Sequence, residues 1–403
     1  MDYELPRSPI DFGPELHLLC LALRRQASAK DRAALADLVA AGPDWTAVAA
    51  EAQRHRVSSL VLAGLQACGA SLPPEALNEL RRESVRGARR ALAQINEIAR
   101  LGRSFEKAGI PLLVLKGAIL SQQLYDDAVL RSARDIDLLV APEQFAVADE
   151  LLIAEGYRHT GRDYSRRELD AYRRRIKDLD YINNTTGVRL ELHHRLTDNQ
   201  NLLPGDFQRL CRTAEKIIIA QVPVLTLPRD ILPVYLCVHG ASHGWHRLIW
   251  LADFAGSLPN PAAAQASLAL AEKFGLGALM LHALALSYVW LGTPVPQDLL
   301  RAAGSTHQGR ALNRVLAALF SGTFLQGTPR TRGERWRNIW LLRAYTYLAK
   351  LDFGYWRSQL ARDLVSPADW DMLPLPERLF WLYPLLRPFG WLLRRPDRAD
   401  DSK

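Results

Sequence analysis

The fold of this chain is decided by the stretch RDIDLLV at residues 134–140, because it places two carboxylates inside a short apolar run. Side chains on a β-strand alternate between the two faces of the sheet, so Asp135 and Asp137 share one face while Ile136 and Leu138 lie on the other. Two like charges on one face predict a site for a divalent cation. Mg²⁺ is commonly held through one or two carboxylates, water and substrate phosphates. The alternative is an aspartate pair that only ends a strand or caps a helix.

A glycine turn precedes this acidic strand. The apolar run PLLVL at residues 111–115 predicts a buried strand that reaches the turn at Gly117, and a helix is expected to begin at Ala118. Backbone N–H groups at the start of a helix bind phosphate oxygens, and Lys116 adds a positive charge beside the turn. We therefore expect Lys116, Gly117 and Ala118 to form part of a phosphate site.

A third acid is expected on a hairpin further along the chain. The segment NNTTG at residues 183–187 predicts the hairpin turn, and VRLELH at residues 188–193 predicts the strand that follows it. Glu191 lies on the polar face of that strand, so it is the candidate third carboxylate of a metal site. Asp178 and Asp180, on the first strand of the hairpin, compete for the same role. The alternative is that Glu191 is only an exposed residue of an edge strand.

A stripe of polar and aromatic residues forms a second candidate site. Five residues recur at steps of four, three, four and three, which predicts one face of a single helix: His239, His243, His246, Trp250 and Asp253. We expect this stripe to line the cleft opposite the carboxylates, with Trp250 or Trp245 offering a stacking surface. His193, on the same strand face as Glu191, is a further possible cleft residue. The alternative is a polar interface between the helix and the sheet. No zinc is expected, because the position after His239 is Gly240 rather than a glutamate and no third ligand is evident.

Basic residues indicate possible contacts with phosphate. Arg131 and Arg134 flank the approach to the aspartate pair and are predicted to bind phosphate, although salt pairing with acids is the alternative. A basic tract between Arg158 and Lys177 could guide RNA, grip a triphosphate or form a solvated helix face. The net charge of +8 is modest for 403 residues, and no aromatic residues alternate with these arginines in a stacking platform. RNA is therefore a possible but not a favoured acceptor.

Length and periodicity predict an α+β protein with three regions. These are a helical region at residues 1–109, a sheet-bearing core at 110–228 and a second helical region at 229–403. Helices are expected at 14–27, 29–41, 45–55, 57–67, 74–108, 118–124, 143–155, 166–176 and from 229 onward with a break at 322–333. Strands are expected at 111–115, 135–140, 178–183, 188–193, 215–219 and 222–226.

Nothing in the sequence predicts a membrane protein or a disulfide framework. The most lipid-like segment, residues 276–291, is too short to span a bilayer, and the start of the chain is too acidic for a signal peptide. The four cysteines are widely spaced. A cytoplasmic location is expected.

The combined motifs resemble a bacterial family of uncharacterised nucleotidyltransferases in the polymerase-beta-like superfamily. The residues that carry the resemblance lie between about 50 and 390: Lys116-Gly117, Leu124-Tyr125, Arg131, 135–140, 190–193, 239–245 and 250–253. The resemblance implies a small mixed sheet backed by helices. It also implies a triphosphate turn at Gly117, a metal pair at Asp135 and Asp137, and a third acid at Glu191. The superfamily's usual serine after the glycine is Ala118 here.

The expected activity is therefore transfer of a nucleoside monophosphate from a nucleoside triphosphate, such as ATP, to a hydroxyl of RNA, a protein or peptide, or a small molecule. Two Mg²⁺ ions during turnover would stabilise the charge that develops on the attacking, leaving and equatorial oxygens. One alternative is a catalytically weak nucleotide-binding or partner-binding protein, which the missing serine makes plausible. Another is a metal-dependent phosphohydrolase that uses the histidine stripe.

Overall fold

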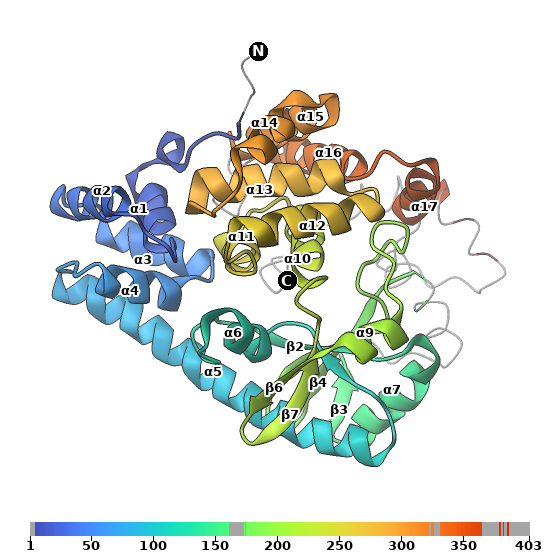
Figure 1. Cartoon of the computed structure of the whole chain (residues 1–403). Helices are drawn as coiled ribbons and strands as arrows, with labels where there is room; N and C mark the ends of the chain where they lie inside the picture. Colours follow the sequence, from blue (N-terminus) through green and yellow to red (C-terminus); the bar gives the residue numbers. More distant parts are fainter. Residues whose placement is uncertain are drawn as a thin grey trace.

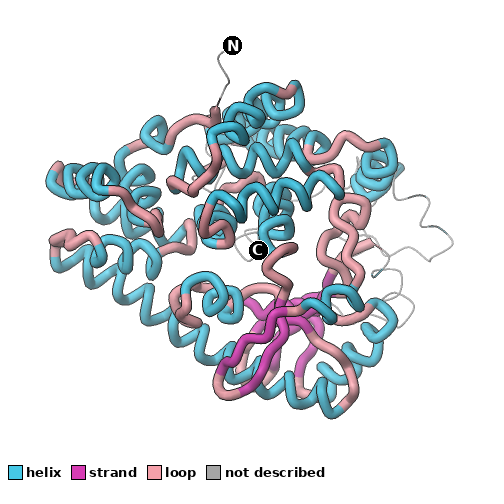
Figure 2. Tube along the Cα trace, viewed as in Figure 1, coloured by secondary structure: helices cyan, strands magenta, loops and turns pink. Residues whose placement is uncertain are grey.

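The protein is an α+β structure whose strands gather at one end of a mostly helical body (Figure 2). The structure is a computed structural model that describes residues 5–160, 173, 175–321, 324–325, 331–364, 379, 382, 385 and 386. The expected fold class, including a small mixed sheet flanked by helices on both sides in sequence, is confirmed.

The chain begins with a group of helices that have clear start signals. Their bounds are η1 (Pro9–Phe12), α1 (Pro14–Ala22), α2 (Ala29–Ala40), α3 (Trp45–Arg54), α4 (Ser58–Ala67) and α5 (Pro74–Lys107). Side chains of Ser28 and Asp44 accept backbone N–H groups at the starts of α2 and α3, and Pro74 occupies the first turn of α5. The long helix α5 runs from the N-terminal helices to the sheet (Figure 1).

Five strands form the main sheet in the order β1-β2-β5-β4-β3. Their bounds are β1 (Leu113–Val114), β2 (Asp135–Leu139), β3 (Tyr157–His159), β4 (Asp178–Asn183) and β5 (Arg189–His193). Strands β2 and β5 pair in parallel, whereas the other neighbours pair antiparallel. The predicted hairpin joins β4 to β5: the Asn183 side chain accepts the N–H groups of Thr185 and Thr186, and Gly187 has a φ of 69°.

The apolar face of this sheet forms its own hydrophobic core. Ile136, Leu138, Leu190 and Leu192 are buried there against helices α5 and α7 (Phe145–Ala154). Burial of these side chains stabilises the sheet by roughly 1.5–3 kcal/mol each. Because neighbouring residues of a strand point to opposite faces, this core fixes which residues face the other way. Those residues are the acids of the candidate site.

Most of the remaining chain is helical. Its elements are α6 (Ala118–Tyr125), η2 (Pro142–Gln144), α9 (Phe207–Thr213), α10 (Leu232–Ser242), α11 (Leu248–Gly256), α12 (Pro261–Lys273), α13 (Gly277–Leu291), α14 (Gln297–Ser305), α15 (His307–Phe320), α16 (Arg332–Leu348) and α17 (Phe353–Leu364), with the hairpin β6 (Glu215–Ile219) and β7 (Val222–Thr226). A second, larger core joins buried residues of the N-terminal helices to those of α10 to α16. The two helical regions of the sequence therefore pack together.

The predicted elements and the observed elements differ in a few places. Strands 178–183, 215–219 and 222–226 are confirmed with their bounds, while β1 is shorter than predicted. The short elements β3 and α9 were not predicted, because neither has a strong periodic pattern. Most of the predicted helix at 166–176 and most of the basic tract between Arg158 and Lys177 lie outside the described residues. Among the residues that the structure describes, no helix has the length and apolar character needed to cross a membrane.

Candidate functional site

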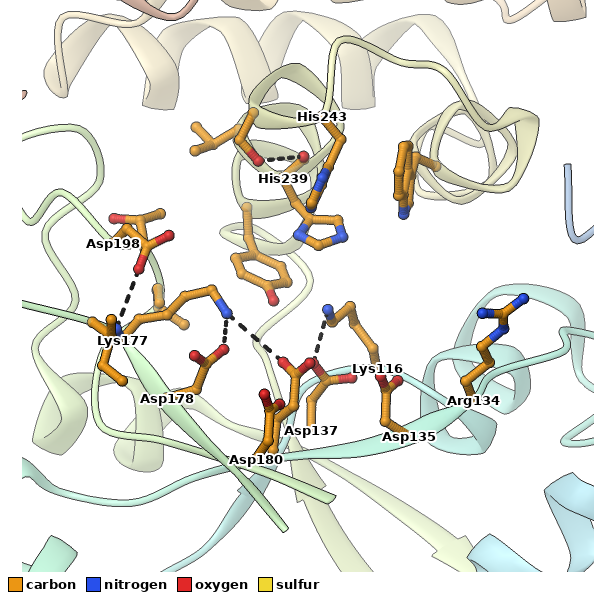
Figure 3. A pocket seen from close by; sticks show the side chains of 18 of the residues that line it. Lys116, Arg134, Asp135, Asp137, Lys177, Asp178, Asp180, Asp198, His239 and His243 are labelled. Atoms are coloured by element: carbon orange, nitrogen blue, oxygen red, sulfur yellow. Dashed lines mark hydrogen bonds and ion pairs between the residues drawn. The ribbon is translucent and has the colours of Figure 1, made fainter. Parts of the chain in front are cut away.

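A cleft of about 750 Å³ lies between the polar face of the main sheet and helices α10 and α11. This volume is within the roughly 300–1,000 Å³ range of small-molecule sites. The sheet side of the cleft includes Asp135, Asp137, Asp178, Asp180 and Glu191, and we call this side the sheet wall. In Figure 3, labelled acids and lysines of the sheet wall face His239 and His243 across the cleft.

Strand register brings the acids of the sheet wall together. Asp137 on β2 pairs with Glu191 on the parallel strand β5, and Glu191 in turn pairs with Asp180 on β4. Side chains of directly paired residues lie on the same face of a sheet, about 4.5–5.5 Å apart at Cβ in antiparallel pairs. The three carboxylates therefore form a row across three strands. Asp135 lies on the same face of β2 as Asp137, two residues earlier.

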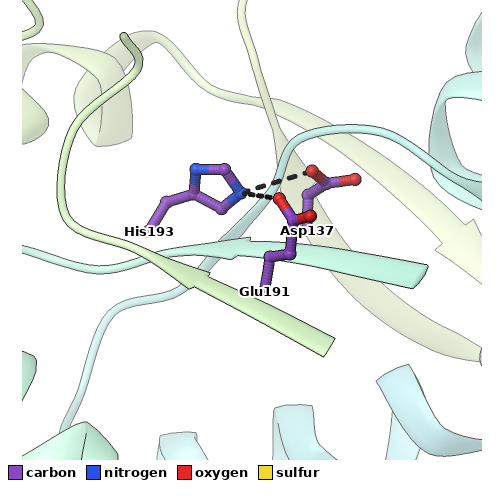
Figure 4. Close-up of side chains that lie close together, drawn as sticks. All are labelled: Asp137, Glu191 and His193. Atoms are coloured by element: carbon purple, nitrogen blue, oxygen red, sulfur yellow. Dashed lines mark ion pairs between the residues drawn. The ribbon is translucent and has the colours of Figure 1, made fainter. Parts of the chain in front are cut away.

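A histidine completes the closest cluster of possible metal ligands. One ligand atom from each of Asp137, Glu191 and His193 lies within 4.8 Å of the others (Figure 4). His193 Nε2 is 3.3 Å from Asp137 Oδ1 and 3.2 Å from Glu191 Oε2. These contacts lack hydrogen-bond geometry, and both ring nitrogens of His193 are buried with no hydrogen-bond partner among the described residues, while Asp137 Oδ1 is in an ion pair with Lys116. Such a set of donor atoms fits a cation.

Two lysines neutralise the row of acids. Lys116 Nζ lies 2.8 Å from Asp137 Oδ1, and Lys177 Nζ lies 3.7 Å from Glu191 Oε2 and also contacts Asp178. Although burial alone would lower the pKa of a lysine, the nearby carboxylates raise the pKa of both ammonium groups, so both remain charged. The sheet wall is therefore a network of buried opposite charges.

The two aspartates of β2 have pKa values shifted in opposite directions. Burial, together with the negative charges of Asp137 and Glu191, raises the pKa of Asp135 to about 6. Burial also acts to raise the pKa of Asp137, but Lys116 and His193 outweigh it and hold that pKa below its ordinary value. Asp137 is thus firmly ionised, while Asp135 is an acid whose charge the protein alone does not fully compensate.

The glycine turn lies before α6, as predicted, but it does not itself line the cleft. Gly117 has a φ of 72° and a ψ of −141°, a conformation that favours glycine, and it is the residue before the first turn of α6. Lys116 lines the cleft, whereas Gly117 and Ala118 are not among the lining residues. Phosphate contact at Gly117 and Ala118 stays a prediction.

The two arginines near the aspartate pair have different surroundings. Arg131 is buried, and its guanidinium makes a bidentate ion pair with Asp253 of α11. Its Nε lies 2.9 Å from both carboxylate oxygens. Arg134 lines the cleft close to Asp135 (Figure 3). Salt pairing, the alternative for Arg131, is therefore what the structure shows, and a phosphate contact by either arginine stays a prediction.

The prediction that the histidine stripe occupies one helix is wrong. Helix α10 ends at Ser242 and α11 begins at Leu248, and between them Gly244 and Trp245 both have positive φ values, 58° and 55°. The helical spacing of the stripe is a coincidence, because residues 243–247 form a turn between two separate helices. Asp253 is on α11 but pairs with Arg131, as described above.

The imidazoles nevertheless meet around Trp250. His243 stacks on the indole with ring centroids 4.5 Å apart, and His246 and His239 meet it edge-on at 4.7 and 5.9 Å. His239, His243 and Trp250 line the cleft, whereas His246 is not among the lining residues. Burial and nearby positive charges lower the pKa of His239 and of His243 well below 6.5, so both imidazoles are neutral at pH 7. We call His239, His243, Trp250 and Tyr235 the helix wall.

Trp245 does not offer a stacking surface. Its indole is 2% exposed, donates a hydrogen bond from Nε1 to the Tyr345 hydroxyl at 3.1 Å, and packs directly against the backbone of Gly240. Of the two tryptophans predicted as alternatives for a stacking surface, only Trp250 lines the cleft, because the Trp245 ring fills the core behind the turn.

The comparison with known proteins agrees with this geometry. A family model described as an uncharacterised nucleotidyltransferase matches residues 41–292. The chain belongs to this nucleotidyltransferase family. No curated protein matches the chain. The match begins before α3 and ends just after α13, so it covers the main sheet and both walls of the cleft but stops well before residue 390, where the resemblance was expected to end.

Several cleft residues were not found from sequence. Lys177 was counted only as part of a basic tract, Tyr235 was not singled out, and Arg56 lies in the N-terminal helical region. The pairing of Asp178 with His193 across β4 and β5 would have pointed to Lys177 as their neighbour. No local pattern pointed to Arg56, because only the packing of the N-terminal helices brings it to the cleft.

Proposed function

We propose that this protein transfers a nucleoside monophosphate from a nucleoside triphosphate to a hydroxyl group of an acceptor, with Mg²⁺ held by Asp135, Asp137 and Glu191. The observation that carries the proposal is the register of β2 and β5, which pairs Asp137 with Glu191 at the floor of the cleft. The raised pKa of Asp135 supports it, because this carboxylate faces two other acids and a cation would relieve that repulsion.

The proposed reaction is an in-line displacement at the α-phosphorus. The acceptor oxygen forms a bond to phosphorus, the bond from phosphorus to the bridging oxygen of the β-phosphate breaks, and pyrophosphate leaves. When bound, Mg²⁺ supplies positive charge to the attacking and leaving oxygens and lowers the pKa of the acceptor hydroxyl. Glu191, at the partly exposed edge of the cluster, accepts the hydroxyl proton.

Other residues of the sheet wall hold the reacting groups in place. His193 is buried beneath Asp137 and Glu191 and contacts both carboxylates, so it orients them. Lys116, whose ammonium lies beside Asp137, is placed to contact a phosphate oxygen of the bound nucleotide. Arg134 is assigned to phosphate binding as well.

The test is to incubate the purified protein with Mg²⁺, each of four radiolabelled nucleoside triphosphates in turn, and a cell extract as the source of acceptor. We expect label from one or more α-phosphates to enter an acceptor fraction with release of pyrophosphate, and both signals to disappear in Asp135→Ala. Sorting the labelled fraction with nuclease and protease identifies RNA, protein or small-molecule acceptors.

The same experiment tests the alternative of a catalytically weak binding protein. Nucleotide binding without pyrophosphate release, in the presence of extract and Mg²⁺ or Mn²⁺, would support that alternative and contradict the proposal. The phosphohydrolase alternative predicts phosphate release that depends on His239 or His243 and not on Asp137.

A further inference from the structure

Arg56 enters the cleft from the turn between α3 and α4, far in sequence from the sheet wall. Its backbone has a φ of 60°, an uncommon conformation for a residue other than glycine. The preceding residue holds this turn against the start of α11: His55 Nδ1 accepts the N–H of Leu248 at 3.1 Å, and His55 O accepts the N–H of Ile249 at 3.3 Å. Two hydrogen bonds between His55 and the start of α11 therefore fix the turn that carries Arg56.

Two of the three nitrogens of the Arg56 guanidinium lack partners inside the described structure. Its Nε and Nη2 atoms are buried and have no hydrogen-bond partner among the described residues. Of the charged groups that act on it most strongly, three are arginines (Arg247, Arg134 and Arg131), and Asp135 is the carboxylate. Burying a cation among like charges without hydrogen bonds is costly, so the arrangement makes physical sense when an anion joins it.

We propose that Arg56 binds the β- and γ-phosphates of the nucleoside triphosphate, beside Arg134 at one end of the cleft. This inference rests on the proposed function, since it names the residue that holds the leaving pyrophosphate. A guanidinium presents several N–H donors in one plane and suits phosphate oxygens, and a triphosphate carries enough negative charge to offset several arginines. Lys116, Asp135 and Arg134 lie along the same part of the cleft (Figure 3).

The electrostatic surroundings of Arg56 distinguish a binding role from a structural one. Burial and the positive charges of Arg247 and Arg134 lower the pKa of Arg56 to about 9, which means that its charge is unfavourable in the protein without ligand. An arginine kept for structure is stabilised by its surroundings, and removing it destabilises the fold. Removing Arg56 should instead leave the ligand-free protein as stable as before, or more stable.

The experiment measures the binding of inorganic tripolyphosphate by titration calorimetry, which requires neither a nucleobase nor turnover. The proteins are the wild type, Arg56→Met, Arg56→Lys and the matched control Arg103→Met, whose side chain is exposed on α5. Loss of hydrogen bonds to a charged group predicts roughly ten-fold to hundred-fold weaker binding in Arg56→Met. Arg56→Lys should recover part of the affinity, and Arg103→Met should match the wild type. Urea unfolding without ligand should show Arg56→Met at least as stable as the wild type.

Two results would overturn the inference alone. These are unchanged tripolyphosphate affinity in Arg56→Met, or a ligand-free variant that is markedly less stable than the wild type. In either case nucleotidyl transfer by the wild type would leave the proposed function standing. A wild-type protein that binds neither tripolyphosphate nor any nucleoside triphosphate would overturn both.

Discussion

The two walls of the cleft differ in the kind of side chain that lines them: one is charged, and the other is aromatic and neutral. The sheet wall carries five carboxylates, three of which, Asp137, Asp178 and Glu191, contact Lys116, Lys177 or His193. The helix wall carries neutral imidazoles packed around the Trp250 ring. One wall is ordered by charge pairing and strand register, and the other by aromatic packing at the junction of two short helices.

This difference separates two physical tasks. Carboxylates fixed by strand register can hold cations at set positions, since moving one acid requires moving a strand. Neutral rings carry no charge to repel a cation, and they can exclude water and contact the uncharged parts of a substrate. The contrast supports the proposal that the reaction takes place at the sheet wall. Substitutions on each wall test this contrast.

The largest effect is expected from Asp137→Asn on the sheet wall. Losing this charge should lower nucleotidyl transfer by roughly 100- to 1,000-fold, the scale seen when one preorganised electrostatic group is removed. Initial rates of pyrophosphate release measure it. Asp37→Asn, at an exposed position on α2, is the matched control and should have wild-type activity. A folded Asp137→Asn protein that keeps half of the wild-type rate would remove the sheet wall from the chemistry.

A change in packing tests the helix wall. An alanine Cβ at position 240 would overlap the Trp245 ring, so Gly240→Ala should lower the free energy of unfolding by about 1–3 kcal/mol. Urea denaturation followed by tryptophan fluorescence measures the loss. Gly102→Ala on α5 is the control, because its added Cβ would meet open space, and it should be neutral or stabilising. Equal stability of the two variants would show that the turn holding the helix wall adapts easily.

Removal of a lysine charge should strengthen metal binding on the sheet wall. The ammonium of Lys177 repels a cation near Glu191, so Lys177→Met should bind Mn²⁺ about ten-fold more tightly in the absence of nucleotide. Free Mn²⁺ can be followed by its paramagnetic resonance signal. Lys216→Met on β6, where the lysine is exposed, should leave the affinity unchanged. Weaker binding in Lys177→Met would mean that the lysine supports the site instead of opposing the cation.

The smallest effect is expected from Asp135→Asn on stability. The folded protein raises the pKa of Asp135 from 3.8 to about 6, so the folded state binds this proton more tightly than the unfolded state does. Stability therefore falls as pH rises through this window, and the penalty is fully present at pH 7. With a chelator present to remove metal ions, Asp135→Asn should raise the free energy of unfolding by about 1 kcal/mol at pH 7 and by less at pH 5. This value allows for the partial exposure of the side chain to water.

Urea unfolding at both pH values measures this gain. A variant that is less stable than the wild type at pH 7 would show that Asp135 is already satisfied within the protein. It would also contradict the argument that a cation is needed to offset the charge of the Asp135 carboxylate.

Much of the sheet wall could be predicted from sequence, because patterns within short segments place its acids. The alternation around Asp135 and Asp137 and the hairpin turn at Gly187 place three acids on one face, and the observed register agrees. The match to a nucleotidyltransferase family confirmed the resemblance that these motifs carry. The roles of the individual acids stay predictions.

The helix wall and the ends of the cleft could not be predicted in the same way. Helical spacing alone did not reveal that Gly244 and Trp245 break the helix, since a tryptophan with positive φ has no sequence signal. Arg56 reaches the cleft only because His55 is bonded to the start of α11, a contact between residues nearly two hundred positions apart. Tertiary packing, which the sequence pattern does not show, determines both the helix break and the position of Arg56.

The buried pair between Arg131 and Asp253 limits how this chain can be divided. The guanidinium belongs to the predicted core at 110–228 and the carboxylate to the predicted helical region at 229–403. A fragment cut at residue 228 would separate this pair and expose the apolar side chains of the larger core, which residues on both sides of the cut share. Truncations that separate these segments should therefore yield insoluble pieces.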